Sequence, residues 1–117
     1  MKSENLKKRT KEFAVRIINL VNALPKNSIG RTIGNQLLRA GTSVGSNYRA
    51  ACRAKSKADF IYKINIVEEE TDESAFWLEL IIEVELFPEN KVRDLLNEAN
   101  ELTAIFVTTG KTAKSKK

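Results

Sequence analysis

The sequence predicts an all-α protein, an antiparallel up-down-up-down four-helix bundle. Apolar residues recur at steps of three and four through four long segments, and no useful stretch alternates apolar and polar residues as a strand would. The only two prolines, Pro25 and Pro88, fall at the ends of two of these segments. Segments of about 20–30 residues joined by short links favour an up-down bundle.

The first helix is predicted from about Asn5 to Leu24, where Pro25 ends it. The second is predicted from about Ser28, as its N-cap, to Ala54. Its apolar period continues through Gly41-Thr42-Ser43, so we expect one long helix, or two nearly collinear pieces with a kink at Gly41. The apolar face predicted for the first helix comprises Leu6, Phe13, Ile17, Leu20 and Leu24. That of the second helix comprises Ile29, Ile33, Leu37, Ala40, Val44, Tyr48 and Ala51.

The third helix is predicted from about Lys57 to Phe87 and the fourth from about Glu89 to Thr109. Residues 1–109 then form a single four-helix domain. Residues 110–117 are small, polar and basic, which predicts a flexible tail. The two stripes are Phe60, Ile64, Val67, Thr71, Ala75, Leu78 and Ile82, followed by Val92, Leu95, Leu96, Ala99, Leu102, Ile105 and Phe106.

The composition argues against catalysis. The chain has no histidine, which removes imidazole bases and histidine-based metal sites, and Cys52 is its only cysteine. Five carboxylates lie within residues 68–73, but consecutive helical positions point in different directions, so we expect no metal site and no cofactor. No apolar run is long enough to span a membrane. We therefore expect a cytoplasmic protein that is not an enzyme.

Charge is distributed unevenly along the chain. Residues 1–63 contain 14 Lys or Arg and 3 Asp or Glu, whereas residues 64–109 contain 2 and 12, and the last eight residues add four lysines. These runs can be solvated faces that attract each other within one bundle. They can also form a basic face that binds phosphate, or that meets the acidic face of another copy.

Four basic residues are the candidates for nucleic-acid binding. Arg49, Arg53 and Lys57 recur every four residues, and Arg39 lies further along the same segment. Each could contact a phosphate. The chain has only two tyrosines, too few for a base-stacking platform, so any binding should depend weakly on base sequence. The alternative is a solvated face paired with acidic groups.

Four glycines, including Gly41 and Gly45, fall on one edge of the second helix. Each interior glycine costs about 0.5–1 kcal/mol relative to alanine, so this edge indicates close approach of another backbone. That backbone belongs either to the same bundle or to a neighbouring subunit. Under the second interpretation, Gly41 and Gly45 lie at an oligomer interface.

The third helix has a second apolar face beside its core stripe, which a monomeric bundle does not need. Trp77 lies at its centre, and it either belongs to a subunit interface or fills a corner of the monomer core. A basic patch that meets a different, acidic patch makes a heterologous contact, which can close into a ring. The predicted interface on this helix comprises Ile66, Glu70, Trp77, Ile81 and Val84.

Over residues 10 to 108 the chain resembles the four-helix-bundle family known from 23S rRNA intervening sequences. The matching features are Gln36-Leu37-Leu38-Arg39, Ser43-Val44 with Asn47, Ser56-Lys57-Ala58-Asp59-Phe60, and Glu68-Glu69 with Leu78-Glu79. The resemblance implies a homopentamer without enzymatic activity. The chain also resembles the accessory proteins of diversity-generating retroelements, which implies association with nucleic acid and a reverse transcriptase.

The chain departs from the family pattern at one place. Many members have Asn-Ile-Ala-Glu-Gly where this chain has Asn47-Tyr48-Arg49-Ala50-Ala51, which marks a distinct subgroup. We expect a ring-shaped homo-oligomer that binds RNA or DNA through its basic face, as an accessory to a larger complex. The alternative is a protein-binding scaffold whose charged faces serve only self-assembly.

Overall fold

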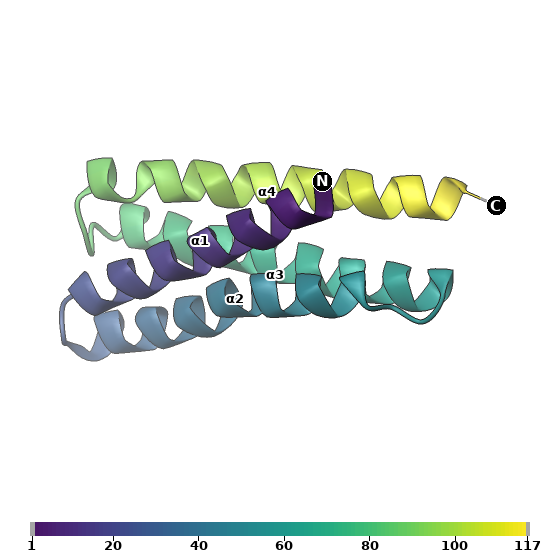
Figure 1. Cartoon of the computed structure of the whole chain (residues 1–117). Helices are drawn as coiled ribbons and strands as arrows, with labels where there is room; N and C mark the ends of the chain where they lie inside the picture. Colours follow the sequence, from purple (N-terminus) through teal and green to yellow (C-terminus); the bar gives the residue numbers. More distant parts are fainter. Residues whose placement is uncertain (1, 117) are drawn as a thin grey trace.

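A computed structural model describes residues 2–116 as four long helices and one short 3-10 helix (Figure 1). No strand occurs among these described residues, so the predicted all-α class is confirmed. The helices run alternately up and down, and the molecule measures 50 × 22 × 19 Å. In chain order they are α1 (Lys2–Ala23), α2 (Ser28–Cys52), α3 (Lys57–Glu83), η1 (Glu89–Lys91) and α4 (Arg93–Ser115).

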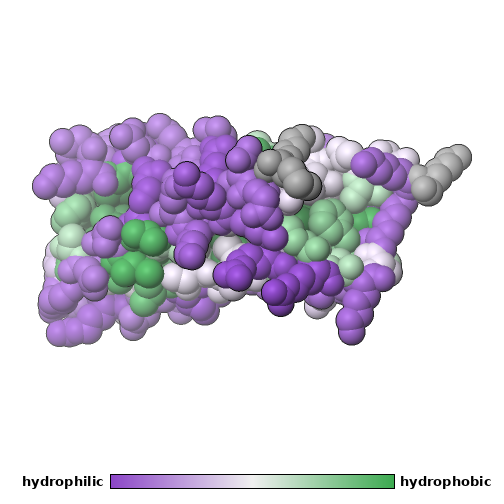
Figure 2. Space-filling model, viewed as in Figure 1, coloured by the Kyte–Doolittle hydropathy of each residue, from purple (hydrophilic) through white to green (hydrophobic). Residues whose placement is uncertain are grey.

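Helix α1 covers only part of the length of the bundle. Each long helix packs against the next one in the chain, and α1 also contacts α4. Figure 1 shows that the first turn of α1 lies beside the middle of α4. Beyond that point the bundle consists of the last turns of α2, the first turns of α3 and the last turns of α4. Figure 2 shows apolar surface at this three-helix end, between α4 and the α2–α3 pair.

Arg9 ties α1 to α4. Its Nε lies 2.7 Å from Oε2 of Glu98 and its Nη2 lies 2.8 Å from Oε1 of Glu101. Hydrogen bonds to Glu98 and then to Glu101 raise the pKa of Arg9 above its usual value. The Arg9 guanidinium is therefore charged at neutral pH, and its ion pairs with the two glutamates link α1 to α4.

The predicted stripes form the core with few exceptions. Phe13, Ile17, Leu37, Val44 and Phe106 are at most 1% exposed. The main error is Ile29, which is 55% exposed. Two successive steps of four residues advance about 80° around a helix, so Ile29 lies off the face that Leu37 shares with the core. Leu6, Phe60 and Ile82 are partly buried and pack against the core cluster.

Helix α2 is continuous through Gly41, as the apolar period predicts. The N-cap is Asn27 and not Ser28, because the Asn27 side chain accepts a hydrogen bond from the Gly30 backbone N–H at 2.8 Å. Ser28 is the first helical residue. The carbonyl of Asn27 also accepts from the N–H of Arg31, so the N-cap lies one residue earlier than predicted.

The glycine edge of α2 faces α1 of the same chain. A β-carbon at Gly41 would lie 2.7 Å from Cγ1 of Ile17, and one at Gly45 would lie 3.4 Å from the Thr10 carbonyl oxygen. Gly41 is buried by this contact and has no surface left for a second subunit, so packing within the chain replaces the interface predicted for it. Gly45 is partly buried by the same neighbour, and its interface role stays a prediction.

The second half of the chain departs from prediction at its helix ends. Helix α3 stops at Glu83, four residues before the predicted end, and Glu85 adopts a positive φ of 54° in the turn that follows. Helix α4 continues to Ser115. The segment from residue 110 predicted as a flexible tail is therefore helical through Ser115, and residue 117 lies outside the described residues.

Candidate nucleic-acid interface

Three helix ends meet at the end of the bundle that α1 does not reach. They are the C-terminal turns of α2 and α4 and the N-terminal turns of α3 (Figure 1). The Lys57 ammonium at the start of α3 donates to the Lys116 carbonyl at the end of α4, which links two of these ends directly. Residues distant in the sequence thus share one surface, which we call the basic end.

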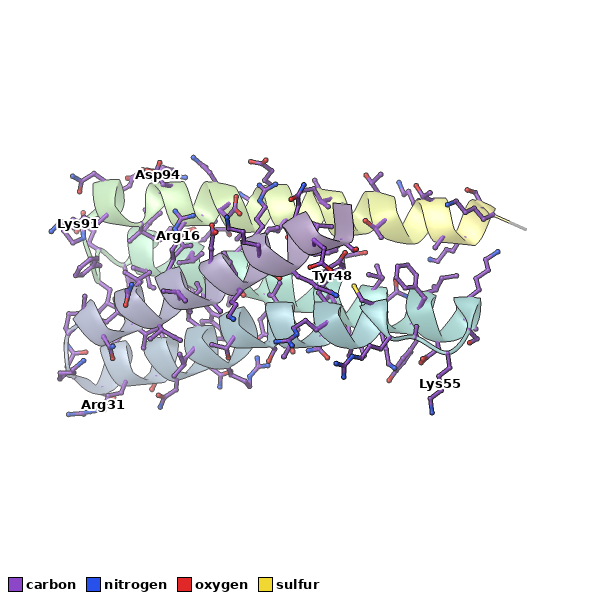
Figure 3. The ribbon with its side chains drawn as sticks, in the orientation of Figure 1. Arg16, Arg31, Tyr48, Lys55, Lys91 and Asp94 are labelled. Atoms are coloured by element: carbon purple, nitrogen blue, oxygen red, sulfur yellow. The ribbon has the colours of Figure 1, made fainter. Side chains whose placement is uncertain are left out.

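The basic end contains eight basic side chains and one carboxylate, Asp59, within residues 45–63 and 102–116. Figure 3 shows Lys55 directed away from the bundle at the turn between α2 and α3. Seven of the eight are exposed, the exception being Lys63. Of these eight side chains, Lys63 alone forms an ion pair with a carboxylate of residues 2–116. The basic side chains are Arg49, Arg53, Lys55, Lys57, Lys63, Lys111, Lys114 and Lys116.

A short capped link determines where the first of these cations lie. Helix α2 ends at Cys52 with Arg53 as its C-cap, and Ser56 Oγ caps α3 by accepting from the Asp59 N–H at 3.0 Å. The spacing of Arg49, Arg53 and Lys57 predicts that they share one helix face. This prediction is wrong, because α2 ends at Cys52, between Arg49 and the other two. The link still keeps all three at the same end of the molecule.

The lysines of α4 complete the basic end, although the sequence pattern did not predict them as binding residues. Gly110 is buried against α3, and a β-carbon there would lie 3.7 Å from Cγ2 of Ile64. This contact holds the last turns of α4 on the bundle and carries Lys111 and Lys114 to the basic end. A signal was present in the sequence, since Gly110 and Ala113 continue the spacing of Leu102 and Phe106 with small residues.

Tyr48 lies between α2 and α4, where the basic end adjoins the first turn of α1 (Figure 3). It is 5% exposed, and its ring centroid lies 5.4 Å from that of Phe106. Burial raises the pKa of the Tyr48 phenol, which stays neutral. Tyr62, in contrast, is 65% exposed on α3. Only one of the two tyrosines is thus available to stack on a base.

Arg39, the fourth candidate for nucleic-acid binding, lies apart from the others. It precedes Arg53 by 14 residues, about 21 Å along a helix. Its Nη1 lies 3.3 Å from Oε1 of Glu70, and its Nη2 forms an ion pair with Glu73. The Trp77 indole N–H donates to the same Glu73 carboxylate at 3.1 Å. Arg39 thus links α2 to α3, and its charge is already compensated.

We expect Arg39→Ala to leave nucleic-acid affinity within about twofold of wild type, because its cation already faces two carboxylates. The same substitution should shift the emission of Trp77, whose partner Glu73 loses its cation. Fluorescence anisotropy and Trp77 emission measure the two effects on one sample. If Arg39→Ala lowers the affinity as much as Arg53→Ala does, Arg39 contacts the nucleic acid and this prediction is wrong.

Comparison with known proteins places the chain in a family. Residues 2–108 match the family model described as 23S rRNA-intervening sequence protein. The chain belongs to this family. No curated protein matches it. The resemblance to the 23S rRNA intervening sequence family inferred from the sequence motifs is confirmed.

A solved structure agrees with this family assignment. The chain is similar to the crystal structure of a protein of unknown function from the S23 ribosomal protein family of Bacteroides thetaiotaomicron. The two are 38% identical, with a TM-score of 0.86, and the match covers 95% of this chain and 99% of that chain. The helical fold is therefore shared over nearly the whole of both proteins.

The apolar face of α3 that was predicted to form an oligomer interface is only partly exposed to solvent. Ile81 is 0% exposed, so it belongs to the core and not to an interface. Helix α3 ends two residues later, and Ile81 follows Ser74 and Leu78 on the buried face. Trp77 and Ile66 are partly buried, and Val84 is 55% exposed.

Glu70, the acidic member of that face, has only 17% of its side chain exposed and pairs with Arg39 of the same chain. Two further findings concern the described part of this family member. Residues 2–116 contain no group of three His, Cys, Asp or Glu side chains arranged to hold a metal ion. Among the same residues, no helix combines the length and apolar character needed to cross a membrane.

The one carboxylate of the basic end, Asp59, holds the α2–α3 link. Its Oδ2 accepts from Lys63 Nζ at 3.0 Å and from the Lys55 backbone N–H at 3.1 Å. The hydrogen bond from Lys63, followed by that from Lys55, lowers the pKa of Asp59. The ionised form is thus favoured by folding.

A lowered pKa in the folded state predicts stability that is present above the unfolded pKa, about 3.9, and is lost as the pH falls through the lower folded value. The melting temperature of wild type should exceed that of Asp59→Asn at pH 7, and the difference should vanish at strongly acid pH. Thermal melts from pH 7 to pH 2 measure it. Asp72→Asn is the control, at an exposed carboxylate that has acidic neighbours on α3 and forms no ion pair within residues 2–116, and it should melt no lower than wild type at pH 7. A constant difference between wild type and Asp59→Asn would contradict the assignment.

Proposed function

We propose that this chain is a non-enzymatic nucleic-acid-binding protein that holds the phosphates of RNA or DNA at its basic end. The observation that carries the proposal is the convergence on one end of the bundle of residues 45–63 and 102–116, which contain eight basic side chains and a single Asp or Glu. Most of these cations are exposed and form no ion pair within residues 2–116. They remain available to a phosphate backbone.

The chemistry at this end favours the backbone over the bases. Lys and Arg that neutralise phosphates release condensed counterions, which gives strong, salt-dependent binding without base readout. Arg49 and Arg53 can each donate two parallel hydrogen bonds to a phosphate. With Tyr62 as the only exposed tyrosine, base stacking contributes little. Binding should therefore depend weakly on base sequence.

The family description supports RNA as the first ligand to test, because it refers to an intervening sequence of 23S rRNA. We further propose that the chain assembles into a ring-shaped homo-oligomer, for which the resemblance implies a pentamer. The partly buried Trp77 and Ile66 and the exposed Val84 support a contact on the α2 side of α3. A ring would repeat the basic end and raise affinity through multivalency.

The test is fluorescence anisotropy with a labelled double-stranded RNA, measured across a salt series. We expect log K to fall linearly with log salt, and the double variant Arg49→Ala with Arg53→Ala to lower the slope by about 2. The matched control, Lys8→Ala with Lys11→Ala, removes two exposed cations from α1 and should change binding little. Light scattering on each variant verifies that the particle mass is unchanged.

The competing proposal is a protein-binding scaffold whose charged faces serve only self-assembly. The same experiment separates the two. If the Arg49 and Arg53 substitutions reduce the particle mass and the protein binds RNA with no dependence on salt, nucleic-acid binding at the basic end is wrong. Loss of RNA affinity at unchanged mass supports it, with the protein as an accessory to a larger nucleoprotein complex such as one containing a reverse transcriptase.

A further inference from the structure

The outward face of α3, opposite the core, carries an exposed aromatic ring within a row of carboxylates. Phe76 is 49% exposed and packs edge-on against Trp77, with ring centroids 5.0 Å apart and planes at 73°. Four acidic residues flank Phe76 at steps of three and four along the same face. They are Glu69 and Asp72 on its N-terminal side and Glu79 and Glu83 on its C-terminal side.

None of these four carboxylates is compensated within residues 2–116. All four side chains belong to exposed residues, and none forms an ion pair, in contrast to Glu70 and Glu73 one face away. Like charges at such spacings repel each other along a helix. The row from Glu69 to Glu83 spans 14 residues, about 21 Å. The face therefore presents a long negative surface with an apolar anchor at its centre.

We propose that this face docks a basic segment of a partner protein, a helix that carries an apolar residue between Lys or Arg residues. Charge complementarity determines the choice of partner, because four unpaired carboxylates select a cationic segment and repel nucleic acid. Phe76 supplies the central aromatic contact that protein interfaces favour, and Trp77 supports its ring from beneath. Anchors at steps of three, four and seven residues match a helix lying along α3.

This docking face lies apart from the basic end and adjoins the proposed oligomer contact, with Trp77 at the border between the two. The basic end lies at the end of the bundle and has the opposite charge. The proposed oligomer contact uses Ile66, Trp77 and Val84 on the side of α3 that faces α2, where Glu70 and Glu73 pair with Arg39. A ring and a bound nucleic acid can thus coexist with a basic partner on the outward face.

The single tryptophan makes the proposal directly testable. The probe is a synthetic 15-residue helical peptide without tryptophan, with a central leucine and lysines three, four and seven residues to either side. We expect it to shift the emission of Trp77, with an affinity that falls with salt. The same peptide with glutamate for each lysine should produce no shift, and neither should a version with serine for the central leucine at the same concentrations.

Three variants locate the contact. Asp72→Lys with Glu79→Lys should abolish the shift, and Phe76→Ala should weaken binding about tenfold, about 1.4 kcal/mol. Glu12→Lys, at an exposed carboxylate of α1, should bind like wild type. All these side chains are exposed, and circular dichroism verifies the fold of each variant. Equal binding by wild type and the double lysine variant would overturn the proposal.

The other possible occupant is the basic end of a second copy. If Trp77 emission shifts with protein concentration in the absence of peptide, and Arg53→Glu with Lys57→Glu removes that shift, the face belongs to self-association and the basic-partner proposal is wrong. If the lysine peptide shifts the emission at protein concentrations where light scattering gives a constant particle mass, the partner assignment is supported, because assembly of the ring at Trp77 does not contribute to that shift.

Discussion

The double variant Lys111→Glu with Lys114→Glu should bind double-stranded RNA about 100-fold more weakly than wild type at about 50 mM salt. Each substitution removes a phosphate contact and adds a negative charge at the basic end. Both lysines are exposed on the last two turns of α4, a segment that Gly110 holds against Ile64 of α3. The slope of log K against log salt should fall by about 2, since each phosphate contact contributes about 0.9.

The matched control for this charge reversal is Lys8→Glu with Lys11→Glu. It makes the same change in net charge on α1, outside the basic end, and should lower affinity only a few-fold through long-range repulsion. Anisotropy titrations of both variants at several salt concentrations measure the difference. If the two variants lose affinity equally, binding depends on net charge and not on a site at the end of the bundle. If the Lys111 and Lys114 variant no longer binds RNA while the Lys8 and Lys11 variant does, α4 lies at the centre of the interface.

The basic end illustrates what a sequence pattern can and cannot locate. The apolar steps through Phe13, Leu37 and Phe106 predict helices and their buried faces, because one periodicity determines both. The position of Lys111 at the same end of the bundle as Arg53 depends instead on where α4 ends. A glycine followed by lysines predicts a flexible tail when the sequence is considered locally. The contact of Gly110 with Ile64 of α3 explains why the helix continues instead.

The acidic half of the chain shows a second limit of the sequence. A helix wheel identifies that α3 is apolar on two sides, but it does not state which side meets α2 and which meets α4. Ile81 therefore entered the predicted interface although it is 0% exposed in the core. Conversely, Phe76 was not selected, although it is the exposed member of the aromatic pair with Trp77. The positions of neighbouring helices decide such cases.

The glycine edge of α2 gives the largest expected effect on stability. Gly30→Ala should lower the free energy of unfolding by about 3 kcal/mol, at the upper end of overpacking costs. A β-carbon there would overlap the carbonyl oxygen of Pro25 and approach Oδ1 of Asn27 to 3.3 Å. Neither group can move freely, because Pro25 belongs to the rigid link between α1 and α2 and Asn27 caps α2. Urea denaturation measures the loss.

Gly45→Ala is the matched control, and it should have the opposite sign. Its β-carbon would lie 3.4 Å from the carbonyl oxygen and Oγ1 of Thr10, which is an ordinary contact distance. Alanine is favoured over glycine in a helix by about 0.5–1 kcal/mol, so the variant should be slightly more stable than wild type. Gly41→Ala should fall between the two, since Ile17 would be only 2.7 Å away but is a side chain.

The order of the three glycine variants tests why the edge exists. If packing within the chain alone requires the glycines, the free energy of unfolding should fall in the order Gly45→Ala, Gly41→Ala, Gly30→Ala, and the particle mass should stay constant. A neighbouring subunit packed on Gly45 would instead make Gly45→Ala lower the mass seen by light scattering while the monomer stays folded. Because Gly45 is the partly exposed member of the edge, its substitution separates packing within the chain from packing between subunits.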